Sequence, residues 1–152
     1  HIDSLFAGIA SKSAYDQLKT GNEFSLGGTF GGGGPLLKLK ADSVYFKNQC
    51  AVVSISKTVI VISKIRRPFH NFQEFDELNL ELSDFKILVV QSGYLSPDLQ
   101  SLSARSFLAL TEGAVNQNLA IIENKHRNKK IYPFQDFDNF IPLVSDGVSL
   151  VS

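Results

Sequence analysis

The sequence predicts a mixed α/β fold, in which an antiparallel β-meander is joined to a parallel β-α-β unit and helices pack on the sheet. Two observations support this prediction. Short runs rich in Val and Ile follow one another with turns of two or three residues between them, which is typical of antiparallel strands. Further along the chain, two apolar runs are separated by a short helical pattern, which is typical of parallel strands joined by a crossover.

The composition is that of a single globular domain. Of the 152 residues, 43% are hydrophobic and 12 are Phe, which gives the chain enough apolar surface to bury a core. We therefore expect residues 1–152 to form one domain. Because the first residue, His1, is not Met and the local pattern is already under way there, we also expect this domain to belong to a longer protein.

Charge and cysteine content narrow the functional class and the compartment. Lys+Arg and Asp+Glu both total 15, so no net field attracts nucleic acid or anionic membranes, and we expect neither as a partner. The single cysteine, Cys50, excludes an internal disulfide. No apolar run approaches the roughly 18 residues of a membrane span and no signal peptide is recognisable, so we expect a cytoplasmic protein.

The N-terminal segment predicts a helix over residues 2–19, broken in two. Ser13, with Asp16 three residues later, forms a capping-box pattern for the second part. Gly21 is placed to end the helix as a C-terminal glycine cap.

A glycine tract follows a short predicted strand at residues 24–26. Six of the eight residues 27–34 are Gly, and ordering so many glycines carries a large entropic cost. A P-loop would continue with Lys and then Ser or Thr, and a dinucleotide-binding loop would continue with a helix, whereas residues 35–41 alternate like a strand. The pattern favours a flexible, lid-like loop, with an anion-binding or substrate-binding loop as the alternative.

Three strands make up the predicted meander: residues 37–41, 50–55 and 59–62. In the first of them leucines and lysines alternate, so one face of that strand is expected to contact water. Cys50 has no His nearby in sequence and no cationic setting that would activate a thiol. We expect it to pack as a small hydrophobic residue and not to act as a nucleophile.

The strand predicted over residues 85–90 organises the second half of the chain. Five of its six residues are apolar, which is typical of a strand covered on both faces. A second buried strand is predicted over residues 106–110, and the helix between the two implies that they pair in parallel. The turn after the first strand, residues 91–93, lies where open α/β sheets present groups to a ligand.

Two short helices flank that first strand in the prediction. Residues 71–74 carry a capping box of Asn and Glu that starts the earlier helix. Ser96 as the cap and Pro97 as the first helical residue start the later one. Leu99 and Leu102 are expected to face the core.

Two C-terminal stretches have a distinctive composition. Residues 125–130 hold four Lys or Arg and one His, which favours a solvated loop, with a phosphate or nucleic-acid contact as the alternative. Residues 131–141 are rich in aromatic side chains. We expect them to dock on the core or on a partner domain, because so much apolar surface is unfavourable in water.

No catalytic or metal-binding constellation is visible in the sequence. His1, His70 and His126 stand far apart, whereas a metal site needs several ligands at converging spacings. Ser92 lacks the Gly-x-Ser-x-Gly elbow of a hydrolase nucleophile, since Val90 occupies the position of the first glycine. We therefore assign no catalytic residue and no metal ligand.

Five short motifs nevertheless occur in a characteristic order: Leu26-Gly27-Gly28, Gly33-Gly34-Pro35, Val89-Val90-Gln91-Ser92, Leu110-Thr111-Glu112-Gly113-Ala114 and Lys129-Lys130-Ile131-Tyr132-Pro133-Phe134. In this order they resemble the C-terminal domain of the MlrC-like (microcystinase C) metallopeptidases. That domain has Leu-Gly-Gly, Gly-x-Pro, Val-Val-Lys-Ser, Leu-Thr-Pro-Gly-Ala and Arg-Arg-Pro-Ile-Tyr-Pro-Leu-Asp at the corresponding places. Gln91 stands where the family has lysine, and Lys130 and Gln135 stand where it has proline and aspartate.

The resemblance implies an accessory C-terminal domain that is inactive alone and lines the active-site cleft of a zinc-dependent peptidase. It places the zinc ligands in the N-terminal catalytic domain of the same protein, so that this chain itself holds no cofactor. The residues implied to face that domain and a peptide-like substrate are Gly27, Gly28, Gly34, Gln91, Ser92 and Gly93. The alternative is a small-anion-binding or protein-interaction module without enzymatic activity.

Overall fold

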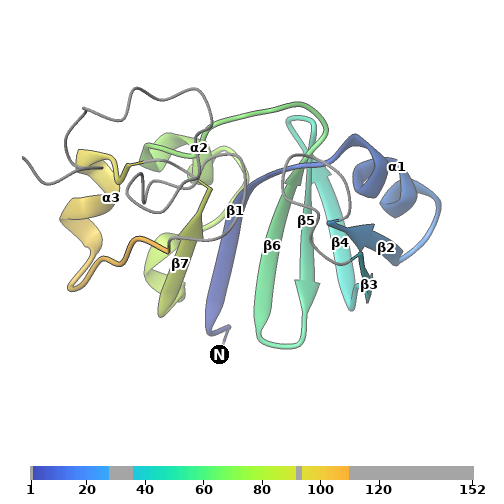
Figure 1. The fold of residues 1–152 in the computed structure, drawn as a ribbon, viewed down its shortest axis with the longest axis horizontal. Coiled ribbons are helices and arrows are strands. Elements are labelled where there is room, and N and C mark those ends of the chain that lie inside the picture. The colour runs from blue at the N-terminus through green and yellow to red at the C-terminus, as the bar shows by residue number, and fades with distance from the viewer. Residues whose placement is uncertain (1, 28–35, 92–93, 110–152) are drawn as a thin grey trace, which may run out of the picture. The chain divides into compact units, whose positions relative to one another are not determined.

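The computed structural model describes residues 2–27, 36–91 and 94–109 (Figure 1). The chain divides into two units, residues 1–109 and residues 110–152, and the fold described below is that of the first. Most of the glycine tract therefore lies outside the described residues. So do the basic stretch at 125–130 and the aromatic segment at 131–141.

A five-stranded mixed sheet forms the centre of the unit, in the order β4-β5-β6-β1-β7 (Figure 1). Its strands are β1 (Ser4–Ala10), β4 (Ser43–Lys47), β5 (Cys50–Ile55), β6 (Thr58–Ser63) and β7 (Ile87–Val90). β4, β5 and β6 form an antiparallel meander, and β1 pairs in parallel with β6 on one side and with β7 on the other. The predicted mixed α/β class, with a meander joined to parallel strands, is confirmed.

The central strand β1 replaces the first part of the helix predicted over residues 2–19. Only α1 (Lys12–Thr20) is helical, and its cap is Ser11, whose Oγ accepts a hydrogen bond from the Ala14 amide at 3.2 Å, so the Ser13 capping box is wrong. Residues 4–10 become a strand because parallel partners on both sides satisfy their backbone groups. Gly21 ends α1 as predicted, although its φ of −176° is extended backbone that any residue adopts.

The meander begins one strand later than predicted. Residues 37–40 do form a strand, β3 (Leu37–Lys40), but it pairs with β2 (Glu23–Leu26) in a separate two-stranded sheet. β4 is the first strand of the meander, and the sequence prediction missed it. The lysines of β3 are exposed and Leu39 packs against the core, as the sequence predicted, whereas Leu37 is 54% exposed, so the predicted alternation holds only in part.

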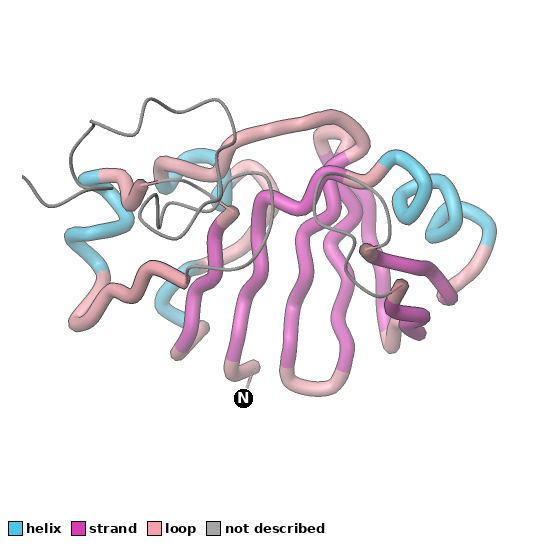
Figure 2. Tube along the Cα trace, in the orientation of Figure 1, coloured by secondary structure: helices cyan, strands magenta, loops and turns pink. Residues whose placement is uncertain are grey.

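Both predicted helix starts in the second half are confirmed (Figure 2). In α2 (Phe72–Asp76), Asn71 and Glu74 form a reciprocal capping box. In α3 (Pro97–Leu102), the Ser96 side chain accepts from the Leu99 amide, and Pro97 opens the helix. A short 3₁₀ helix, η1 (Leu82–Asp84), precedes β7. Leu99 is buried as predicted, whereas Leu102 is mostly exposed, so its inward placement is wrong.

Two apolar clusters cover opposite faces of the sheet. The first cluster lies beneath α2 and α3 and includes Cys50 and Val52 of β5. The second cluster lies beneath α1 and the β2-β3 pair and includes the alternate β5 residues Ala51 and Val53. The burial of Cys50 in the first cluster confirms that it packs as a small hydrophobic residue.

β7 is an edge strand, which corrects the prediction that residues 85–90 are covered on both faces. Leu88 and Val90 pack against the first cluster, whereas Ile87 and Val89 are 58% and 40% exposed. The second strand predicted next to it does not form in the described part, because residues 106–109 have no strand pairing and Phe107 is 89% exposed. β1 is instead the parallel partner of β7.

None of the helices described here is both long and apolar enough to cross a membrane.

Candidate functional site

Three parallel strands end at the same edge of the sheet. Ala10, the last residue of β1, pairs with Ser63, the last residue of β6, and β7 ends at Val90 beside Ala7 (Figure 2). The carboxyl ends of β6, β1 and β7 are therefore neighbours. This edge is the usual place for ligand-binding groups in a sheet with parallel strands.

At this edge the chain leaves β1 and β6 toward opposite faces of the sheet. After β1 it enters α1, whose buried residues belong to the second apolar cluster. After β6 it runs through residues 64–71 to α2, whose Phe75 belongs to the first cluster. Neighbouring strand ends whose connections diverge in this way are called a topological switch point, and ligands of open α/β sheets usually bind at such points.

Hydrogen bonds hold the two diverging segments together where they leave β1 and β6. The Ser11 amide donates to the Ser63 carbonyl at 3.0 Å, and the Ser63 hydroxyl donates to the Ile9 carbonyl at 3.3 Å. Ser63 is buried, and none of the buried side-chain nitrogen or oxygen atoms in the described residues lacks a partner. These contacts fix the positions of the side chains that follow β6.

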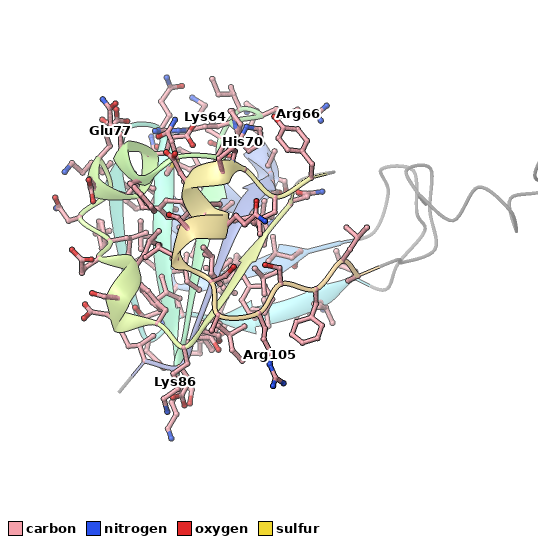
Figure 3. The ribbon with its side chains drawn as sticks, turned by 90° about the vertical axis from the view of Figure 1, so that its left-hand side faces the viewer. Lys64, Arg66, His70, Glu77, Lys86 and Arg105 are labelled. Atoms are coloured by element: carbon pink, nitrogen blue, oxygen red, sulfur yellow. The ribbon has the colours of Figure 1, made fainter. Side chains whose placement is uncertain are left out.

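Four positively chargeable residues follow β6 at this end of the unit: Lys64, Arg66, Arg67 and His70. Figure 3 shows Lys64, Arg66 and His70 gathered there together with Glu77, whereas Lys86 and Arg105 lie at the opposite end. This group was not predicted from the sequence. A signal was available, because Lys and Arg come directly after a buried strand of Val and Ile.

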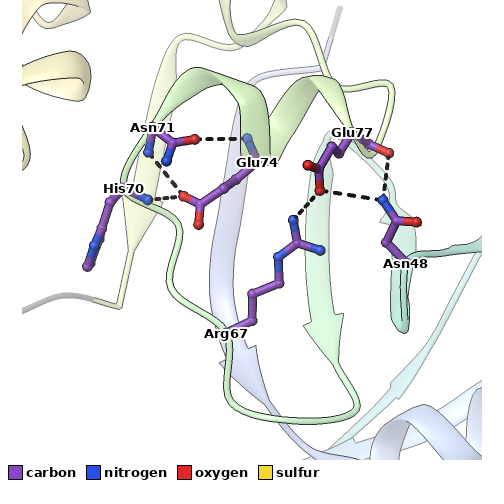
Figure 4. A network of polar contacts seen from close by, with 6 residues as sticks. All are labelled: Asn48, Arg67, His70, Asn71, Glu74 and Glu77. Atoms are coloured by element: carbon purple, nitrogen blue, oxygen red, sulfur yellow. Dashed lines mark hydrogen bonds and ion pairs between the residues drawn. The ribbon is translucent and has the colours of Figure 1, made fainter.

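Arg67 is fixed by several contacts (Figure 4). Its Nη2 lies 2.7 Å from Glu77 Oε2 in an ion pair, and its guanidinium lies 5.5 Å from the centroid of the Phe69 ring. The Asn48 amide nitrogen lies 3.5 Å from both the Glu77 carboxylate and the Glu77 carbonyl. Glu77 therefore links the loop after β6 to the turn between β4 and β5.

The backbone of His70 makes hydrogen bonds through both its amide and its carbonyl. Its amide donates to the Glu74 carboxylate, which also accepts from the Asn71 amide at 3.0 Å (Figure 4). Its carbonyl accepts from the Ser96 hydroxyl, the same group that caps α3. The His70 ring lies 5.4 Å from the Tyr94 ring. One residue thus connects the caps of α2 and α3 near the carboxyl edge of the sheet.

Cys50 lies at this edge, but its chemistry is that of a buried thiol. Burial raises the pKa of the Cys50 thiol, and the nearby Arg67 guanidinium opposes that shift only in part. A thiol with a raised pKa is mostly protonated near neutral pH and is a poor nucleophile.

Gln91 follows β7 and is packed closely against β1. Its amide donates to the Ala7 carbonyl at 3.1 Å, so that it extends the parallel ladder by one residue. Gly8 lies beside it with φ of +92°, and a Cβ on Gly8 would lie 3.2 Å from both Gln91 Cβ and Gln91 N. The pairing of β1 with β6 also shifts register between Phe6 and Ile9. A glycine at position 8 therefore allows β7 to end close to β1.

Gly8→Ala is expected to lower the free energy of unfolding by about 1–3 kcal/mol, because alanine is strained at positive φ and its methyl group would push against Gln91. Gly21→Ala is the matched control, since Gly21 has extended backbone and a methyl group there would meet no other atom within 4 Å. Urea denaturation of both variants tests this. Equal stability of the two would contradict the packing described for Gly8.

Comparison with known families shows the family to which this chain belongs. A family model described as MlrC C-terminus matches residues 28–126, about two thirds of the chain. The chain belongs to the MlrC C-terminal domain family. The resemblance seen in its motifs is thereby confirmed. Searches of curated proteins and of solved structures found no match.

The matched range of this MlrC C-terminal domain begins after β1, α1 and β2. The structure nevertheless makes β1 part of the same fold, since β1 pairs with both β6 and β7 within the sheet. Residues that precede the matched range therefore complete the carboxyl edge. The basic residues that follow β6, and Gln91, all lie inside the range.

Of the six residues predicted to face a substrate, two are described. Gln91 is exposed at the carboxyl edge of the five-stranded sheet, and Gly27 is exposed at the end of β2, with φ of +97°. They follow strands of two different sheets. The other four lie outside the described residues: Gly28, Gly34, Ser92 and Gly93. The substrate-facing role of all six stays a prediction.

The described residues of the MlrC C-terminal domain do not fit a zinc site. Among them, no group of three or more His, Cys, Asp or Glu side chains is placed to hold a metal ion. We therefore assign no catalytic step to a metal on these residues.

Proposed function

We propose that this chain is the accessory C-terminal domain of an MlrC-like zinc metallopeptidase, that it lines the active-site cleft, and that it is not catalytic by itself. The observation that carries the proposal is the family match over residues 28–126. In this proposal zinc is held by the N-terminal catalytic domain of the same protein. That domain is the partner, and the substrate is peptide-like.

The carboxyl edge of the sheet is the surface that we propose to face the cleft. Two facts favour it over the rest of the unit. Gln91 is exposed there, at the position where the family motif has lysine, and the connections after β1 and β6 diverge to opposite faces at the same edge. Gln91 carries no charge, so its contribution to substrate binding would be hydrogen bonds from its amide group.

Peptide hydrolysis measured with and without added zinc tests the proposal. The 152-residue chain alone is expected to give no turnover in either condition, and the parent protein is expected to be active with zinc. Gln91→Ala in the parent protein should lower kcat/KM by about 3- to 10-fold, the loss expected for one net hydrogen bond.

Ser83→Ala is the control, because Ser83 is exposed and lies in η1, which precedes β7 at the opposite end of the sheet. It should leave kcat/KM unchanged. Turnover by the chain alone would rule out an accessory role, and equal effects of the two substitutions would rule out the carboxyl edge as the wall of the cleft.

The second candidate is a small-anion-binding module without enzymatic activity. One observation favours it, namely that Lys64 and Arg66 lie at the carboxyl edge, and neither has an ion pair with a carboxylate among the described residues. A local excess of positive charge of this kind attracts anions even though the chain as a whole is neutral.

A further inference from the structure

A small pocket lies at the carboxyl edge, between the ends of β5 and β6 and the loop that leads to α2. Its volume is about 220 Å³. The residues that matter most for its chemistry are Asn48, Cys50, Ile65, Arg66, Arg67 and Pro68. They come from the turn before β5, the start of β5 and the loop after β6. None belongs to the set that the sequence predicted to face a substrate.

The charges around this pocket do not cancel. Arg67 is half-buried and paired with Glu77, so the positive charge of Arg67 is largely balanced. Arg66 is exposed, and it has no ion pair with any carboxylate among the described residues. Arg67 also keeps unused donors, because a guanidinium has five N–H groups, of which the contacts with Glu77 and Cys50 use only part. The pocket therefore offers one net positive charge and several oriented donors.

The rest of the lining is mixed, with Asn48, Gln49 and Ser63 as its polar residues and Cys50, Ile65 and Pro68 as its apolar ones. Ile65 is 59% exposed, Pro68 is exposed, and buried Cys50 forms part of the wall. An exposed isoleucine and proline next to two arginines form a surface that suits a ligand with an anionic end and an apolar body. A fully polar dianion such as phosphate would leave the apolar part of this wall unused.

The size of the pocket is a further guide to the kind of ligand that it binds. A single water needs only about 10–15 Å³ of such volume, so the pocket has room for a small organic ligand. Pockets for drug-sized ligands and cofactors usually have about 300–1,000 Å³. One amino-acid residue with its terminal carboxylate suits a pocket of this size.

We propose that this pocket binds a carboxylate carried by a short apolar group, of the kind found at the C-terminal residue of a peptide. Arg66 and the unused donors of Arg67 contact the carboxylate, and Ile65 and Pro68 contact the apolar group. Glu77 and the Phe69 ring hold Arg67 in position and do not touch the ligand, and Asn48 contacts Glu77 from the pocket wall. This inference does not depend on the proposed function, because it concerns binding to this chain alone.

The test is a titration of the full 152-residue chain, labelled with ¹⁵N, followed by amide chemical shifts. The probes are N-acetyl-leucine, its C-terminal amide and inorganic phosphate. N-acetyl-leucine is expected to bind with a Kd on the order of 1 mM. The shifts should be largest at residues 48–50 and 63–67, and the amide and phosphate should bind at least about tenfold more weakly, because the first lacks the charge and the second lacks the apolar group.

Arg66→Gln should weaken binding of N-acetyl-leucine by roughly tenfold or more, since it removes a charge-assisted contact, and Arg66→Lys should retain part of it. Arg105→Gln is the matched control, because Arg105 is also exposed but lies at the opposite end of the unit (Figure 3). Binding of the amide as tight as that of the acid, or equal losses in the two Gln variants, would overturn the proposal. Tighter binding of phosphate than of N-acetyl-leucine would overturn the assignment of the ligand.

Discussion

Phe75→Ala is expected to lower the free energy of unfolding by about 3–5 kcal/mol, the usual cost of removing a fully buried phenylalanine. Phe75 is 0% exposed, and its ring lies 5.2 Å from the Phe69 ring at a tilted angle of 54°. Small domains are typically stable by only about 5–15 kcal/mol, so this one substitution would remove a large part of the total. Urea denaturation followed by circular dichroism measures the loss.

Phe72→Ala is the control for this result, because it makes the same chemical change in the same short helix. Phe72 is 38% exposed and is the first residue of α2. Phe72→Ala should lower the free energy of unfolding by much less than Phe75→Ala does. Comparable losses would mean that α2 does not pack on the sheet with the face described here.

Leu5→Ala is expected to cost about 2–5 kcal/mol. Leu5 is 0% exposed in the first apolar cluster, and its neighbours in the sheet are Val59 on β6 and Leu88 on β7. The substitution leaves a cavity between strands that are hydrogen-bonded on both sides, so the surroundings are poorly able to collapse into it. The unfolding free energy from the same denaturation experiment gives the cost.

Phe6→Ala is the matched change on the other face of β1. Phe6 is partly exposed and follows Leu5 directly, so it points to the opposite side of the sheet. It should destabilise the unit less than Leu5→Ala, even though a larger side chain is removed. The reverse order would show that residues 4–10 do not lie in the sheet with this face inward.

Features that depend on neighbouring residues were predictable from the sequence. The capping box of Asn71 and Glu74 requires only two side chains and the amides between them, and it is found as predicted. The start of α3 at Ser96 and Pro97 is equally local. The two turns that flank β5 place the antiparallel partners within a few residues of each other, so most of the meander could also be predicted.

Features set by distant partners were not predictable in the same way. β1 is flanked by strands whose paired residues lie more than 50 positions later in the chain, and the run from Ser4 to Ala10 satisfies both a helical and a strand pattern. β7 has the composition of a buried strand because its inward residues need apolar contacts, yet Ile87 and Val89 face outward at an edge. Composition gives the type of such a strand but not its place in the sheet.

The candidate site was predicted in part. The position of Gln91 after a parallel strand follows from the strand-turn-helix pattern, and the structure places Gln91 at the carboxyl edge. The arginines after β6 were not recognised as candidate site residues. They lie at a candidate site only because β1 pairs with β6 and the chain after β1 runs to the other face of the sheet. That arrangement requires the long-range pairing that the sequence pattern did not reveal.

The candidate site depends on β1 lying between β6 and β7, which brings three carboxyl ends to one edge. Nuclear Overhauser contacts in the full chain test this most directly. Contacts across the backbone should link Leu5 to both Val59 and Leu88. Sequential helical contacts through residues 4–10, or contacts from Leu5 to only one of the two strands, would contradict the sheet order and with it the candidate site.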